Sequence, residues 1–82
     1  MQYHYVVTRL IDLLTPLANG RLVVDEDTEL ASHLALDSVQ VIELVAVVED
    51  EFDISISINA IAEVKTVREF ALQIQKIVNA NR

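Results

Sequence analysis

The chain has 82 residues, which suits one small domain with a single hydrophobic core. Its 13 acidic and 6 basic residues give a formal net charge of −7, which disfavours nucleic acids and anionic membranes and favours basic partner surfaces. The absence of cysteine excludes disulfides and any thiolate chemistry of the protein itself. No apolar run reaches the length of a membrane span, and no signal-peptide pattern is present. We therefore expect a single domain over residues 1–82 that is cytoplasmic and monomeric.

Apolar residues recur at helical spacing near the start of the chain and predict a helix from Tyr3 to Leu14. Pro16 disfavours helical geometry at Thr15, and Asn19 and Gly20 readily adopt the left-handed backbone of a turn. The first helix is therefore expected to end at this point.

About twenty residues, from Ala18 to Asp37, connect this helix to the next. We expect this loop to be ordered, because its apolar residues can pack against the helices: Leu22, Val23, Val24, Leu30 and Leu34. Its acidic residues lack the central glycine and terminal glutamate of an EF-hand, so no metal site is expected.

Ser38 lies at the start of the most apolar stretch of the chain. Asp37 is a favourable N-cap residue, and Gln40 three positions later can complete a capping box. A helix should therefore begin near Ser38, with the serine hydroxyl in its first turn. Unpaired backbone N–H groups and the positive end of the helix dipole make this a favourable place for a phosphate diester. One face of the helix is predicted to be buried: Val41, Leu44, Val45, Val48 and Phe52.

The same helix has more apolar surface than one core contact requires, and it ends in a run of acids. The acids lie where the helix dipole is already negative, so each is expected to cost roughly 0.3–1 kcal/mol. Together with Glu43, they are interpreted as a docking surface for basic partners rather than as a stabilising feature. The further apolar residues are Val39, Ile42, Ala46 and Val47, and the acids are Glu49, Asp50, Glu51 and Asp53.

The last third of the chain predicts two more helices. The alternation from Ile54 to Ile58 has the pattern of a strand, but no partner strand exists, so we read Asp53 to Ser57 as an extended connection. A short helix is predicted from Ile58 to Ala62. Thr66 and Glu69 form a capping box that begins the last helix, whose tail from Asn79 to Arg82 is expected to fray.

Catalytic signatures are absent from the sequence. His4 and His33 have no matched acid or nucleophile, and no triad, paired-carboxylate site or glycine-rich phosphate loop is present. No catalytic residue is assigned, and the protein is not expected to be an enzyme. His33 lies five residues before Ser38 and is a candidate contact for a group attached there.

The chain resembles the acyl carrier protein family in three features. They are the tripeptide from Asp37 to Val39, the apolar helix with Glu43, and the sequence EDEFDI from Glu49. The resemblance spans essentially the whole chain. It implies an all-α four-helix bundle of acyl-carrier type, with three long helices and one short third helix, forming a single carrier domain over residues 1–82. It also implies that Ser38 bears a 4′-phosphopantetheine arm, which is transferred from coenzyme A with the help of Asp37. The thiol of this arm holds cargo as a thioester.

The resemblance further implies several enzyme partners. They are a phosphopantetheinyl transferase, an acyl- or aminoacyl-loading ligase, and synthase or transferase enzymes with basic docking surfaces. The residues expected to meet these partners are Val39, Ile42, Glu43 and Ala46, with Glu49 as a more distal contact.

Some positions differ from those usual in fatty-acid carriers. These carriers usually have glycine before the Asp-Ser pair, an acid two residues after the serine, and an acidic third helix, where this chain has Leu36, Gln40 and the neutral stretch from Ile58 to Ala62. A specialised fatty-acid or polyketide-type pathway is therefore favoured over routine fatty-acid synthesis. A peptidyl or aminoacyl carrier is one alternative. An unmodified helical protein-interaction module is an alternative of another class.

Overall fold

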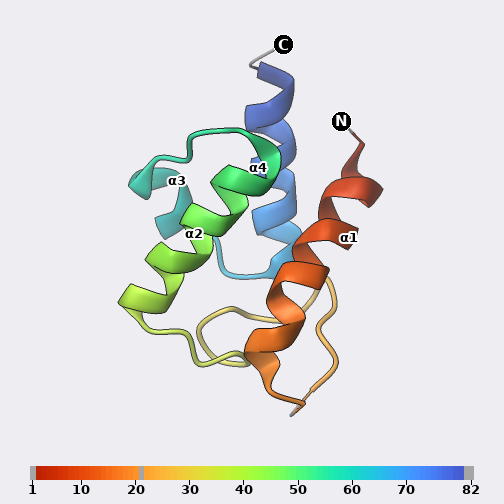
Figure 1. Cartoon of the computed structure of the whole chain (residues 1–82), viewed down its shortest axis with the longest axis vertical. Coiled ribbons are helices and arrows are strands. Elements are labelled where there is room, and N and C mark those ends of the chain that lie inside the picture. The colour runs from red at the N-terminus through yellow and green to blue at the C-terminus, as the bar shows by residue number, and fades with distance from the viewer. Residues whose placement is uncertain (1, 21, 81–82) are drawn as a thin grey trace.

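The computed structural model describes residues 2–20 and 22–80. Its elements are α1 (Tyr3–Leu14), the 3₁₀ helix η1 (Thr15–Ala18), α2 (Ser38–Phe52), α3 (Ile58–Ala62) and α4 (Val67–Ala80). The long helices α1, α2 and α4 form the body of the bundle, and the short α3 lies at its edge (Figure 1). The predicted all-α bundle with three long helices and one short third helix is confirmed.

The core is built from the apolar faces of the three long helices. α1 packs closely against α4, where Phe70 and Ile74 are completely buried. α2 contributes Leu44, Val48 and Phe52 to the same core, as the helical spacing predicted. α3 contributes no buried residue. Ala60 and Ile61 pack only partly against the core, so the position of α3 also depends on how the segments at its ends are attached.

The end of α1 follows the prediction, with one addition. Thr15 and Pro16 form part of η1, so the chain makes one tighter turn before it leaves the bundle. The Thr15 hydroxyl donates to the carbonyl of Ile11 at 2.7 Å. Asn19 and Gly20 have φ angles of 53° and 75°, which confirms the predicted left-handed positions.

The long loop between α1 and α2 is ordered by backbone hydrogen bonds to the start of α4. The N–H of Arg68 donates to the carbonyl of Glu26 at 2.9 Å, and the N–H of Val67 donates to that of Thr28 at 3.0 Å. For the described residues of the loop, 18–20 and 22–37, the expectation of an ordered loop is therefore confirmed. The packing prediction is wrong for Val23, which is 87% exposed, because the apolar contacts of the loop are made by Val24, Leu30 and Leu34.

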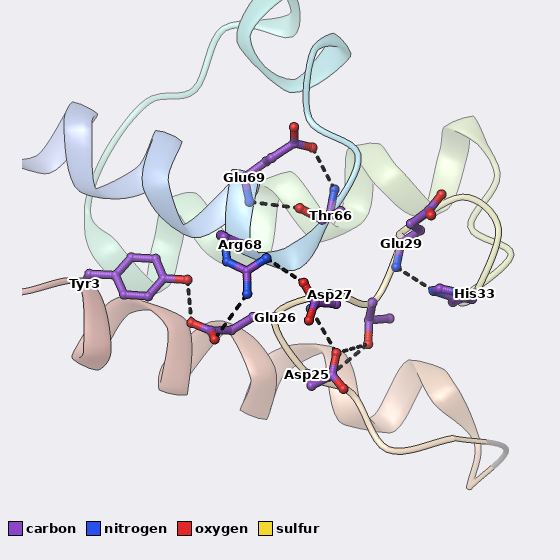
Figure 2. A network of polar contacts seen from close by, with 10 residues as sticks. Tyr3, Asp25, Glu26, Asp27, Glu29, His33, Thr66, Arg68 and Glu69 are labelled. Carbon is purple, nitrogen blue, oxygen red and sulfur yellow. Dashed lines mark hydrogen bonds and ion pairs between the residues drawn. The ribbon is translucent and has the colours of Figure 1, made fainter.

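Side chains reinforce this attachment, as Figure 2 shows. The Tyr3 hydroxyl donates to Glu26 at 2.6 Å, and Arg68 pairs with both Glu26 and Asp27. Burial and the bond to the Glu26 carboxylate raise the pKa of the Tyr3 phenol. The bond to Asp27 and its negative charge raise the pKa of Arg68. Several acids of the loop are therefore used within the chain itself.

The capping box at the start of α4 is present as predicted. The Thr66 hydroxyl accepts from the N–H of Glu69 at 3.1 Å, and the Glu69 carboxylate accepts from the N–H of Thr66 at 3.0 Å and of Lys65 at 2.8 Å. These backbone donors lower the pKa of Glu69. α4 extends to Ala80, further than predicted, and residues 81 and 82 lie outside the described residues.

The lowered pKa of Glu69 predicts a pH-dependent contribution to stability. Ionised Glu69 stabilises the folded state above its ordinary pKa of 4.5, and this contribution is lost as the pH falls through the lower folded-state pKa. As the pH is lowered below 4.5, the free energy of unfolding should therefore fall less in Glu69→Gln than in the wild type. The reason is that glutamine can keep the capping geometry without titrating. Urea unfolding at a series of pH values measures the effect.

The control is Glu63→Gln, which removes the same charge from an exposed residue outside the capping box. A Glu69→Gln profile that declines in parallel with the wild-type profile would contradict the prediction.

Candidate functional site

Ser38 is the first residue of α2, and its side chain is exposed. The Asp37 carboxylate accepts from the N–H of Gln40 at 2.8 Å, and the Gln40 side-chain oxygen accepts from the N–H of Asp37 at 3.1 Å. The predicted capping box is therefore confirmed. It fixes the residue at which the helix begins and holds the Ser38 hydroxyl in the first turn.

The segment that leads into Ser38 is held on the bundle. Leu34 and Leu36 are buried, and the N–H of Leu36 donates to the carbonyl of Leu30 at 3.3 Å. Between them, Ala35 adopts a left-handed backbone with φ of 53°, a conformation that costs a residue other than glycine roughly 1–2 kcal/mol. No local sequence pattern predicted this conformation at Ala35. The packing of the two leucines on either side holds the chain in it.

A groove of about 590 Å³ runs between α2 and the segment that contains α3. Asp37 and Ser38 lie at one end, and Glu49 lies about 16 Å further along the helix axis, from the rise of 1.5 Å per residue. The remaining lining is entirely aliphatic: Leu36, Val41, Ile42, Val45, Ala46, Ile56, Ile58 and Ile61. The Ser38 hydroxyl therefore lies at the mouth of an apolar groove.

The predicted docking residues occupy the outward face of α2. Val39 and Ile42 are 63% and 65% exposed, and Glu43 and Ala46 are also exposed. Their spacing of three or four residues places them beside one another along the helix. The structure therefore brings these four residues together next to Ser38.

Glu49 differs from these four because its side chain is only partly exposed and has a partner within the chain. Its carboxylate accepts from the N–H of Ile56 at 2.6 Å. In addition, Arg9 of α1 pairs with Glu51 at 3.1 Å. The interpretation of the terminal acids as a docking surface did not include these contacts of Glu49 and Glu51 within the chain. Sequence reasoning missed both contacts, because the partners lie outside the local helical pattern.

His33 does not lie at the groove. Its ring nitrogen Nδ1 accepts from the N–H of Glu29 at 2.8 Å (Figure 2), and its side chain lines a separate cavity with Leu22 and Val23. The hypothesis that His33 contacts a group on Ser38 is not supported by this arrangement. His4 is an exposed residue of α1.

The comparison with known protein families decides the identity of this fold. A family model described as "phosphopantetheine attachment site" matches residues 6–74. The chain belongs to the phosphopantetheine attachment family. It is therefore a carrier domain of the kind found in acyl carrier proteins, and its cofactor is covalently bound 4′-phosphopantetheine.

The family match extends from α1 into α4 and includes the start of α2 and the groove. A search of curated proteins gives no match. Within the described residues, every helix is too short or too polar to cross a membrane. Membership in the family implies contacts with enzymes that modify the carrier and with synthases that use it.

The N-cap of α2 can be tested by substitution. Asp37→Ala removes the acceptor for the N–H of Gln40 and should lower the free energy of unfolding by about 1 kcal/mol. Asp37→Asn should cost much less, because asparagine is as favourable an N-cap as aspartate. Urea unfolding measures both values. Equal losses for the two variants would show that the charge of Asp37, rather than its capping bond, stabilises the fold.

Proposed function

We propose that this carrier domain holds a pathway intermediate as a thioester on a 4′-phosphopantetheine arm attached to Ser38, and presents it to partner enzymes. The observation that carries the proposal is the position of Ser38. Its exposed hydroxyl lies in the first turn of α2, within the matched family region and at the mouth of the apolar groove. Residues 1–82 act as one carrier domain in this proposal, and the chemistry is performed by the partners.

The backbone around Ser38 suits a phosphodiester. The N–H groups of the first helical turn have no intrahelical acceptor, and that of Gln40 already donates to Asp37. The N–H groups of Ser38 and Val39 therefore point toward the place where a phosphate on the serine oxygen would lie. Asp37 holds this turn in shape and so presents the serine to the transferase. The phosphate makes the loaded form a phosphoprotein.

The groove favours an acyl or polyketide cargo. Apart from Asp37, Ser38 and Glu49, its lining consists of aliphatic side chains, which gain free energy by covering an apolar chain. This supports a carrier in specialised fatty-acid or polyketide-type biosynthesis. A peptidyl or aminoacyl carrier is the alternative. A polar aminoacyl group would gain little free energy in this groove, so it would stay outside.

The surface around Ser38 defines the kind of partner that fits. Val39 and Ile42 offer apolar contact, Glu43 offers a negative charge, and α3 contains no charged residue. We propose that the transferase, the loading ligase and the synthase enzymes each present a basic group next to an apolar patch. The docking role of Glu49 and the cytoplasmic location stay predictions.

The attachment site is tested by mass. Wild-type protein incubated with coenzyme A and a broad-specificity phosphopantetheinyl transferase should gain one phosphopantetheine group, and Ser38→Ala should gain none. Ser32→Ala is the control, because Ser32 is another exposed serine and does not line the groove. It should load as the wild type does. Intact-mass spectrometry gives the result.

Loading of Ser38→Ala would exclude Ser38 as the attachment point. Failure of the wild type to load with a transferase that modifies a control carrier would favour the unmodified interaction module instead.

The docking surface is tested by charge reversal. Glu43→Lys should weaken binding to the phosphopantetheinyl transferase roughly tenfold at low salt, and the difference should shrink as salt screens the charges. Calorimetric titration at two ionic strengths measures the effect. Glu63→Lys is the control, because it makes the same charge change at an exposed residue beyond α3. An equal loss for both variants would indicate a general charge effect rather than docking at Glu43.

A further inference from the structure

The position of α3 depends on its connection to α2. No residue of α3 is fully buried, and only Ala60 and Ile61 pack partly against the core, so core packing holds α3 weakly. The connection, residues 53–57, is attached to α2 through Glu49. The Glu49 carbonyl accepts from the N–H of Asp53 and, at 3.1 Å, from that of Ile54. The Glu49 carboxylate accepts from the N–H of Ile56 at 2.6 Å.

These bonds also position one wall of the groove. Ile56 is 9% exposed and lines the groove, and Ile58 and Ile61 continue the same wall in α3. The hydrogen bond from Glu49 is made to the backbone of the first of these three residues. A change in this bond therefore acts on the side of the groove that has fewer buried residues than α2.

The charge of Glu49 is unfavourable for the helix by itself. It lies near the C-terminal end of α2, next to Asp50 and Glu51, where the helix dipole and the neighbouring carboxylates oppose a further negative charge. A short hydrogen bond to a carboxylate is stronger than one to a neutral acceptor, and this one is partly shielded from water. The carboxylate is thus suited to fastening the connection.

We propose that Glu49 is a positioning residue for the cargo, which holds residues 53–57 and α3 against α2 and so keeps an aliphatic acyl chain sheltered from water. This inference rests on the proposed function, because it requires cargo on the Ser38 arm. When the bond is lost, the wall formed by Ile56, Ile58 and Ile61 moves away from α2, and water reaches the thioester. A cargo too short to enter the groove is unaffected.

The test compares Glu49→Ala with the wild type, both carrying an arm loaded with either an octanoyl or an acetyl group. Two rates are measured: hydrogen exchange of the Ile56 amide by NMR, and cleavage of the thioester by hydroxylamine. Glu49→Ala should speed Ile56 exchange roughly tenfold, the effect expected for loss of a charge-assisted bond. It should also speed cleavage of the octanoyl thioester severalfold and leave the acetyl thioester unchanged.

Three further variants separate the bond from other effects. Glu49→Gln keeps an oxygen acceptor without the charge, so both of its rates should lie between those of Glu49→Ala and the wild type. Glu49→Met keeps the length of the side chain without the acceptor and should behave as Glu49→Ala does. It replaces Glu49→Ala in the test if the alanine variant does not fold. Asp50→Ala removes a neighbouring exposed carboxylate and should match the wild type.

The role of Glu49 is overturned if octanoyl cleavage is unchanged in both the alanine and methionine variants. It is also overturned if acetyl and octanoyl thioesters are accelerated equally, or if Glu49→Gln behaves no differently from Glu49→Ala. Intact mass is read before any rate. A wild-type chain that accepts no arm overturns the proposed function itself, and with it the role of Glu49 toward cargo.

Discussion

The reciprocal hydrogen bonds between Asp37 and Gln40 fix the first residue of α2, and the arrangement of the whole site depends on that residue. Each step along an α-helix turns the side chain by about 100°, so the direction of the Ser38 side chain relative to the faces of α2 is fixed only if Ser38 lies within the helix, as the cap ensures. The buried face, with Leu44 and Val48, is held by the core. The core therefore sets the orientation of α2 about its axis, and the cap sets its first residue. Together they leave the Ser38 hydroxyl exposed at the mouth of the groove.

Much of this arrangement could be predicted from the sequence, because its signals are local. The capping residues of α2 and α4, the apolar spacing of α1 and the left-handed Asn19 each depend on residues within a few positions. The sequence could not reveal how the long loop is attached. Its bonds join Glu26 and Asp27 to Arg68, and both α2 and α3 lie between these residues in the chain.

The acids of this chain serve two different purposes that composition cannot distinguish. Glu26, Asp27, Glu49 and Glu51 have partners within the molecule, so they stabilise the fold or position its segments. Glu43 lies on the exposed face beside Ser38, where a charge is available to a partner. The net charge of −7 therefore overstates the acidity of the docking surface. Recognition at that surface depends on apolar contact as well as on charge.

α2 combines three tasks in one rigid element. Leu44 and Val48 face the core, Val41 and Val45 line the groove, and Val39 and Glu43 face outward. Because the helix fixes the angles between these faces, a partner seated on the outward face also lies at the edge of the groove. The opposite wall is different, since α3 has no buried residue and is held by its connection to Glu49. The groove thus has one wall on a helix with three buried residues and a second wall in which only Ile56 is buried, and the hydrogen bonds to Glu49 help to hold this second wall.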